Sequence, residues 1–239
     1  MPGSWVPRGR VLVFAREPRP GHVKTRMCPP LTLDQAAAFY SHLLDDVLEA
    51  TAGVAETLGL EAVLCLDGEA AVDSFEQRAP AGFRVVAQRG EGLAERMARA
   101  VSEACTGGAE RVLLRGSDSP MLGLAHFEEA LQALEDHDLA LSPALDGGYG
   151  LVAVKQPWPG LFDHPMSTPT VCADTLAQAE RLGARACRVK ACFDLDRWHD
   201  LRVLEDARTG PEAALCPRTL AYLDEGQLWP SREDGLPEG

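Results

Sequence analysis

Short apolar runs alternate along the chain with longer segments whose apolar residues recur every three or four positions. Runs of four to six residues are typical of buried strands, and the longer pattern is typical of amphipathic helices. The expected strands in the first half are 11–14, 61–66, 83–88 and 111–115. The expected helices are 32–48, a weak one near 69–78, 93–105 and 124–135. This alternation predicts a parallel sheet with right-handed crossovers.

The second half departs from that repeat. The runs 139–144 and 150–154 flank Asp146-Gly147-Gly148, whose turn chemistry predicts an antiparallel pair of strands. Thr168 and Pro169 have the form of an N-cap and the first residue of a helix that ends near Gly183. The remaining expected elements are a strand at 185–192, a helix from about Arg197 and a short helix within 211–224. The pattern predicts a three-layer α/β/α fold, with a mainly parallel twisted sheet and one antiparallel element.

Length and composition suit one globular domain. The chain has 239 residues, and 46% of them are apolar, which is enough for a full core. We expect a single domain over 1–225 and a frayed tail over 226–239. The seven cysteines have no paired CxxC spacing, which favours reduced thiols in a cytoplasmic protein. No signal-peptide core or long apolar run is present, so we expect neither secretion nor a membrane span.

Charge is distributed unevenly. The net charge of −13 argues against binding to nucleic acid or to an anionic membrane. Residues 1–27 nevertheless carry six Arg and Lys residues against one acid, Glu17, so the rest of the chain carries about −18. This contrast predicts a local anion site near the N-terminus.

The segment that follows the first strand contains that basic group. It reads Ala15-Arg16-Glu17-Pro18-Arg19-Pro20-Gly21-His22-Val23-Lys24-Thr25-Arg26. Pro and Gly fix the loop, while Lys24 and Arg26 offer cationic donors to a phosphate chain. The spacing matches neither a P-loop nor a dinucleotide-binding motif. The alternative is a surface loop whose charges are only solvated.

Acidic residues follow two later strands. Asp118 lies in Gly116-Ser117-Asp118-Ser119-Pro120 after the fourth strand, and Asp194 and Asp196 follow the last. Carboxylates that converge from two strand ends repel one another unless a cation joins them, so the pattern predicts Mg²⁺ or Mn²⁺ held by these three residues. The alternatives are an Asx-turn at Asp118 and an N-cap at Asp194 or Asp196.

Two glycine-bearing loops also follow strands. The loop 88–92 predicts a close backbone approach to a base or ribose, and the loop 146–149 predicts one to a second substrate. Tight turns need glycine in any case, so each signal is weak. Arg96 suits a phosphate contact, with a surface ion pair as the alternative. We assign no histidine a catalytic role.

Together these segments resemble a bacterial glycosyltransferase family associated with radical-SAM and selenodomain genes, some members of which are labelled for arsenosugar biosynthesis. More distantly, they resemble molybdenum-cofactor and phospholactate nucleotidylyltransferases. The matching segments are Phe14–Arg26, Gly116–Pro120, Asp146–Tyr149 and Asp194–Asp196 with Asp200-Leu201. The resemblance implies the nucleotide-diphospho-sugar transferase fold, called GT-A. The sequence departs from the family at Gly150, Met166 and Asp196-Arg197-Trp198-His199-Asp200, near the expected acceptor pocket.

The resemblance and the residue patterns together give one set of expected roles. The expected catalytic residues are Lys24, Arg26, Asp118 and Asp146. The expected nucleotide-binding residues are Ala15, Arg16, Pro20, Gly21, Lys24, Arg26, Gln88, Gly92, Arg96 and Ser117. The expected acceptor-binding residues are Asp146, Gly147, Gly148, Tyr149 and Ser167, and the expected metal ligands are Asp118, Asp194 and Asp196.

Three functions are compatible with these residues. The resemblance favours glycosyl transfer from a nucleotide sugar to a small-molecule acceptor. The opening loop favours nucleotidylyl transfer, because a fixed Lys and Arg at the first turn suit a nucleoside triphosphate. The third is a non-catalytic nucleotide-binding module, which the intact acids argue against, because clustered carboxylates without a cation are costly.

Overall fold

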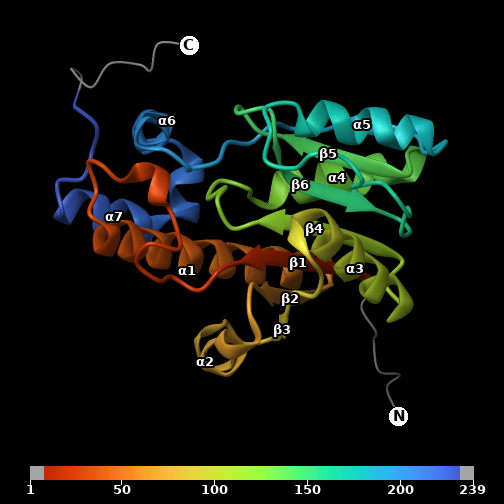
Figure 1. The fold of residues 1–239 in the computed structure, drawn as a ribbon, viewed down its shortest axis with the longest axis horizontal. Helices are drawn as coiled ribbons and strands as arrows, with labels where there is room; N and C mark the ends of the chain where they lie inside the picture. The colour runs from red at the N-terminus through yellow and green to blue at the C-terminus, as the bar shows by residue number, and fades with distance from the viewer. Residues whose placement is uncertain (1–7, 232–239) are drawn as a thin grey trace.

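A seven-stranded twisted sheet forms the centre of the computed structural model, which describes residues 8–231 (Figure 1). The strands are β1 (Gly9–Ala15), β2 (Leu60–Leu66), β3 (Phe83–Ala87), β4 (Arg111–Gly116), β5 (Leu139–Pro143), β6 (Tyr149–Val154) and β7 (Ala186–Arg188). Their order across the sheet is β3-β2-β1-β4-β6-β5-β7. β6 runs antiparallel to both β4 and β5, and the other neighbouring pairs are parallel. The predicted mainly parallel sheet with an antiparallel element is confirmed.

Helices and short 3₁₀ turns connect the strands. The helices are α1 (Leu33–Leu58), α2 (Val72–Arg78), α3 (Gly92–Thr106), α4 (Leu124–Asp136), α5 (Val171–Arg181), α6 (Leu201–Ala207) and α7 (Pro217–Glu225). The 3₁₀ turns are η1 (Thr25–Met27), η2 (Glu69–Ala71), η3 (Trp198–Asp200) and η4 (Pro211–Leu215). The predicted capping box of α1 is present, because Thr32 Oγ1 accepts from Gln35 N and Gln35 Oε1 accepts from Thr32 N.

The sheet is buried on both faces, which explains why its central strands are continuously apolar. In β1, Val11 and Val13 pack on the side of α1, while Leu12 and Phe14 pack on the opposite side with α3. The α4, α6 and α7 helices lie on the α1 side, and α5 lies on the α3 side (Figure 1). This arrangement is the predicted three-layer fold.

Three predicted element boundaries are wrong. The helix expected over 32–48 continues to Leu58 as α1. α5 begins at Val171, and Thr170 rather than Thr168 is its N-cap. Cys172 N donates to Gly147 O at 3.0 Å, so the turn before β6 satisfies a free N–H group of this helix in place of a side-chain cap. The last strand, expected over 185–192, is regular only over Ala186–Arg188. Beyond it the chain follows β5 through isolated contacts, such as Cys192 N to Pro143 O at 2.9 Å.

The chain after α7 turns back onto that helix. Leu228 N donates to Leu223 O, and Trp229 Nε1 donates to Asp224 Oδ1, both at 2.8 Å. Residues 232–239, the remainder of the expected tail, lie outside the described residues. Within 8–231, none of the helices combines the length and the apolar character needed to cross a membrane.

A buried carboxylate joins α7 to α1. The Asp46 side chain is fully buried and accepts hydrogen bonds from Thr219 N at 2.7 Å, Thr219 Oγ1 at 2.8 Å and Arg218 N at 3.2 Å. These donors lie in the first turn of α7, whose N–H groups have no partner within the helix. Asp46 therefore acts as a cap supplied by another helix.

Replacing Asp46 by alanine should lower the free energy of unfolding by about 3 kcal/mol, because it leaves several buried donors unsatisfied. Urea denaturation followed by circular dichroism would measure the loss. Asp45→Ala is the matched control, since Asp45 pairs with Arg78 near the surface and should cost less than about 1 kcal/mol. Equal losses in the two variants would contradict the capping role.

Candidate functional site

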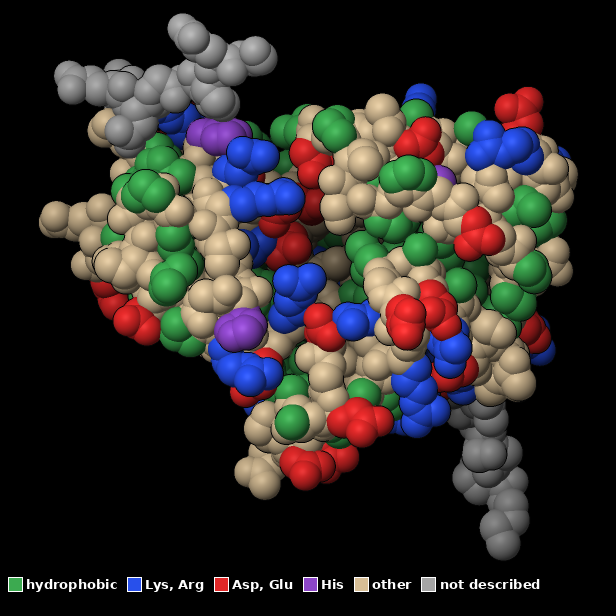
Figure 2. Space-filling model, viewed as in Figure 1, with side chains coloured by type: hydrophobic (Ala, Val, Ile, Leu, Met, Phe, Trp, Pro, Cys, Tyr) green, Lys and Arg blue, Asp and Glu red, His purple; other side chains and the backbone are tan. Residues whose placement is uncertain are grey.

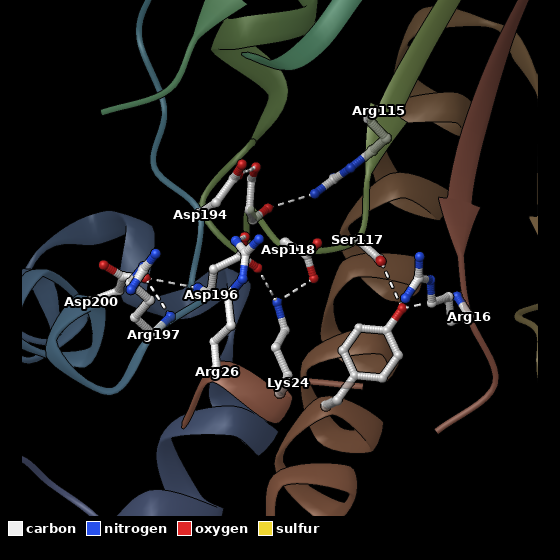
Figure 3. Close-up of polar contacts among 12 residues, drawn as sticks. Arg16, Lys24, Arg26, Arg115, Ser117, Asp118, Asp194, Asp196, Arg197 and Asp200 are labelled. Carbon is white, nitrogen blue, oxygen red and sulfur yellow. Dashed lines mark hydrogen bonds and ion pairs between the residues drawn. The ribbon is translucent and has the colours of Figure 1, made fainter. Parts of the chain in front are cut away.

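The carboxyl ends of β1 and β4 meet at one edge of the sheet, which is where open α/β sheets bind ligands. The segments after both strands, together with residues 194–200, surround this edge (Figure 3). In the space-filling view, Lys and Arg side chains form a row beside Asp and Glu side chains around a hollow in the middle of the face (Figure 2). The opposed charges predicted from the sequence are therefore brought together.

Lys24 is at the centre of this group. Its Nζ donates to Asp118 Oδ1 and, at 2.9 Å, to Asp196 Oδ1. The Lys24 side chain is only 4% exposed, whereas those of Asp118 and Asp196 are 40% and 36% exposed. Arg26 Nη1 lies 3.9 Å from Asp196 Oδ2, and its side chain is 59% exposed. Lys24 thus neutralises Asp118 and Asp196, two of the predicted metal ligands, from the buried side. Arg26 is exposed to solvent.

The backbone and the charges both single out Lys24. Its φ of 48° and ψ of 31° are left-handed, a conformation that costs a non-glycine residue about 1 kcal/mol or more and is often found at functional sites. Burial alone lowers the pKa of the Lys24 ammonium, but Asp118 and Asp196 outweigh it and raise that pKa above its usual value. Burial raises the pKa of Asp196, but Lys24 outweighs it and holds that pKa below its usual value. Lys24 is therefore a permanent cation.

Asp194 has a different environment, although it is two residues from Asp196. One of its carboxylate oxygens accepts a hydrogen bond from Ser119 Oγ. Burial and the nearby charge of Asp118 raise the pKa of Asp194 to about 7. Asp118 and Asp194 therefore repel each other, as the sequence predicts for converging acids.

The chain after β1 is held to the chain after β4 by a hydrogen-bonded group. The Tyr40 hydroxyl from α1 lies 2.7 Å from Ser117 Oγ and accepts from Arg16 N at 3.1 Å. Ser117 is buried, whereas the Arg16 side chain is 66% exposed. Pro20 and Gly21 are exposed in the same loop, with Gly21 at φ 78°. The side chains of Arg16 and Arg26 are thus exposed to solvent on a loop that Tyr40 holds in place.

A second polar group lies at the ends of β1, β2 and β3. Gln88 Nε2 donates to Cys65 O at 2.8 Å and to Ala15 O at 3.3 Å. Asp67 Oδ1 pairs with Arg96 Nη1 at 2.6 Å, and Asp67 Oδ2 lies 3.6 Å from Arg16 Nε. Arg96 thus forms an ion pair, and its contact with a nucleotide stays a prediction. Arg16 connects this group to the loop that carries Lys24.

A cavity of about 380 Å³ lies between α3 and the first three strands. Apolar side chains such as Leu12, Val63 and Val86 line it, with Gln88 among its other lining residues. Lys24, Asp118 and Asp196 are not among those residues. This cavity is therefore distinct from the charged group.

The expected acceptor residues are less closely linked to Lys24. Asp146 Oδ1 accepts from Gly148 N at 2.9 Å, which forms an Asx-type turn, although its charge contributes to the raised pKa of Asp194. Gly147 has φ 89°, and a Cβ there would lie 1.8 Å from Pro169 O. The Tyr149 hydroxyl is buried without a hydrogen-bond partner among the described residues. Ser167 is exposed, with φ 61°, so the structure ties neither Tyr149 nor Ser167 to the charged group.

Tyr40, Asp67, Ser119 and Asp200 were given no role from the sequence, although Ser119 and Asp200 lie in segments that carry the resemblance. Asp67 directly follows β2, the same signal that identified Asp118, and could have been found. Asp200 Oδ2 accepts from Asp196 N at 2.8 Å and from Arg197 N at 2.6 Å, which fixes the backbone beside Asp196. Tyr40 and Ser119 gave no separate signal, because a tyrosine on an apolar helix face and a serine in a turn are ordinary.

The three predicted metal ligands do not form one cluster. Among residues 8–231, no three His, Cys, Asp or Glu side chains are grouped so that they could hold a metal ion by themselves. Lys24 donates to both Asp118 and Asp196, so an ammonium joins two of the three acids. Asp118 and Asp194 lie near enough for their charges to repel, and the metal stays a prediction.

Comparisons with known proteins bear on the fold. Residues 50–168 match a family described as "Uncharacterized protein conserved in bacteria (DUF2064)". A search of curated proteins gave no match. A crystal structure from Desulfovibrio desulfuricans G20, provisionally assigned as a nucleotide-diphospho-sugar transferase, is 28% identical with a TM-score of 0.77, over 92% of this chain and 98% of that one.

Two further structures share the fold at lower identity. A cytidylyltransferase from Leptospira borgpetersenii serovar Hardjo-bovis (strain JB197) is 12% identical, with a TM-score of 0.55, over 97% of this chain and 99% of that one. A 4-diphosphocytidyl-2C-methyl-D-erythritol synthase from Anaerococcus prevotii DSM 20548 is 10% identical, with a TM-score of 0.55, over 83% and 96%. The chain therefore has the nucleotide-diphospho-sugar transferase-like fold, and its residues 50–168 match the DUF2064 family.

Proposed function

We propose that the protein is an enzyme that transfers a glycosyl group from a nucleotide sugar to a small-molecule acceptor. The observation that carries this proposal is the Lys24 ammonium held between Asp118 and Asp196, with Arg26 exposed beside it. The exposed guanidinium of Arg26 would stabilise the negative charge that a departing nucleoside diphosphate gains, and Lys24 would neutralise the two nearby carboxylates that otherwise repel it. The 28% identical structure with a matching assignment supports the same class.

Different residues of the chain would bind the donor and the acceptor. Arg16 and Arg26, both largely exposed, would bind the diphosphate of the donor. Gln88, Arg96 and the backbone of Ala15, Pro20, Gly21, Gly92 and Ser117 would surround the nucleoside.

Asp146 would take the proton of the acceptor hydroxyl as that oxygen bonds to the sugar and the bond from sugar to diphosphate breaks. Gly147, Gly148, Tyr149 and Ser167 would shape the acceptor side, and the class of acceptor, arsenosugar-type or other, stays a prediction.

Asp118 and Asp194 fit a divalent cation better than the three predicted ligands do. They are acidic neighbours that repel, and Mg²⁺ is commonly held by one or two carboxylates together with substrate phosphates. We therefore propose Mg²⁺ or Mn²⁺ at Asp118 and Asp194, with Asp196 retained as the partner of Lys24. A bound ion would supply further charge neutralisation for the departing diphosphate.

Nucleotidylyl transfer is the second candidate. The exposed guanidinium groups of Arg16 and Arg26 favour it, because they have donors available for a third phosphate. The position of Lys24 weighs against it, since two carboxylates already engage the ammonium that would otherwise grip a triphosphate.

Product analysis would test these proposals. The purified protein is incubated with Mg²⁺, with Mn²⁺ or with EDTA, together with nucleoside triphosphates or nucleotide sugars and a mixture of small hydroxylated acceptors. Glycosyl transfer releases a nucleoside diphosphate and should stop in EDTA. Release of pyrophosphate instead would replace the first proposal by the second. Binding of nucleotide without turnover of any donor would indicate a non-catalytic module.

A further inference from the structure

Arg115 is a buried cation at the end of β4. Its side chain is fully buried and is the largest such side chain among the described residues. Burial lowers the pKa of its guanidinium to about 10, so the group is still charged at neutral pH. Within residues 8–231 it forms no direct ion pair with a carboxylate, although the charge of Asp194 is near enough to oppose the effect of burial on its pKa. Burying a charge without such a partner is costly unless hydrogen bonds compensate.

Neutral oxygens surround this guanidinium. Nη2 donates to Ser119 O at 2.6 Å, Nε to Gly116 O at 3.1 Å, and Nη1 to Leu122 O at 3.3 Å and to Thr51 Oγ1 at 3.1 Å. The Phe127 ring lies beneath it, with its centroid 6.0 Å from the guanidinium carbon. Three of the four acceptors are carbonyl groups of 116–122, the segment that carries Asp118.

These carbonyl contacts explain how the segment presents its side chains. Gly116 O and Ser119 O accept hydrogen bonds from Arg115, and the side chains of the two residues between them point toward Tyr40 and Lys24 (Figure 3). Ser117 there contacts Tyr40, and Asp118 contacts Lys24. An apolar side chain at 115 would fill the space but leave three carbonyl groups without their donors.

We propose that Arg115 is a positioning residue that holds the 116–122 segment around its guanidinium and thereby sets the direction of the Asp118 carboxylate. The part of this inference that concerns turnover rests on the proposed function, whereas the part that concerns the segment does not. The residue acts through backbone carbonyls and not through contact with a substrate. A lysine cannot replace it fully, because one nitrogen cannot reach three carbonyl groups at once.

Hydrogen exchange measured by mass spectrometry tests the positioning directly. Arg115→Met should raise the exchange rate of the amides of 116–122 at least about tenfold more than that of amides elsewhere in β1 and β4. Arg111→Met is the matched control, because Arg111 lies on the same strand and pairs with Glu135 near the surface. A uniform rise across the sheet would mean that Arg115 contributes only to global stability, and would overturn the proposal.

Manganese binding and steady-state kinetics give a second readout. Mn²⁺ binding, followed by electron paramagnetic resonance, should weaken at least about tenfold in Arg115→Met and stay unchanged in Arg111→Met. The kcat should fall about 100-fold with little change in the donor KM, since Arg115 does not touch the donor. Wild-type Mn²⁺ affinity and kcat in folded Arg115→Met would overturn the proposal.

A second variant covers the case in which Arg115→Met does not fold. Arg115→Lys keeps the charge but loses the forked donors, and it should show the same local rise in exchange to a smaller extent. Exchange and Mn²⁺ affinity equal to those of wild type would overturn the proposal. If no donor is turned over by the wild-type protein, the proposed function fails, while the exchange result still decides the role of Arg115.

Discussion

Replacing Lys24 by methionine should lower kcat for the transfer reaction by about a thousandfold. The change removes the ammonium that bonds to both Asp118 and Asp196 and leaves the two carboxylates facing each other without a cation. They would repel each other and turn outward, so the diphosphate would meet two carboxylates that no cation neutralises. The measurement is kcat at saturating donor, with nucleotide release as the signal.

Two companion variants separate the charge from the backbone. Lys155→Met is the matched control, because Lys155 is also paired with an acid, Asp138, at 3.7 Å, and its loss should leave kcat within about twofold. Lys24→Gly relieves the left-handed backbone while removing the charge. It should be as inactive as Lys24→Met but more stable. An active Lys24→Gly would show that the cation is not required.

Replacing Asp194 by asparagine should stabilise the protein at pH 8 by about 2–4 kcal/mol when EDTA is present. The pKa of Asp194 is raised to about 7 by burial and by the charge of Asp118, whereas an unfolded Asp titrates near 4. Between these two values the folded state holds a proton that the unfolded state has lost. The contribution of Asp194 to the free energy of unfolding therefore falls as the pH rises from about 4 to about 7. Asparagine does not ionise, so the variant lacks this pH-dependent loss.

Urea denaturation at intervals from pH 4 to pH 8 would measure this effect. Wild type and Asp194→Asn should have similar stability at pH 4 and diverge as the pH rises. Asp163→Asn is the control, because Asp163 is exposed, and it should shift the curve by less than about 0.5 kcal/mol at any pH. Parallel curves for wild type and Asp194→Asn would show that the carboxylate carries no such penalty.

The sequence predicted most of the fold, because the signals are local. β1 and β4 are continuous apolar runs, and Thr32 with Gln35 marks the start of α1 through a hydrogen-bond pattern within four residues. The start of α5 was mispredicted, because its cap is a carbonyl group from the Gly147 turn, and no local pattern encodes such a partner.

The sequence identified several residues of the candidate site, but not how they contact one another. Lys24 and Asp118 were recognisable because each follows a buried strand at the ligand edge. Their direct contact was not, since it depends on a left-handed residue and on loop paths that composition does not specify. The same limit explains why Asp196 was grouped with Asp118 and Asp194 as a metal ligand, although it contacts Lys24. Arg115 was read as part of a strand, because an arginine at a strand end is usually exposed.

The contacts of Lys24 also determine which parts of the protein can fold first during synthesis. Its two carboxylate partners are 94 and 172 residues away in the chain, and closing such long loops is slow compared with forming local structure. The second partner lies in the last fifth of the sequence. A chain emerging from the ribosome can therefore form α1 early. It cannot complete the contacts of Lys24 with Asp118 and Asp196 until Asp196 has left the exit tunnel.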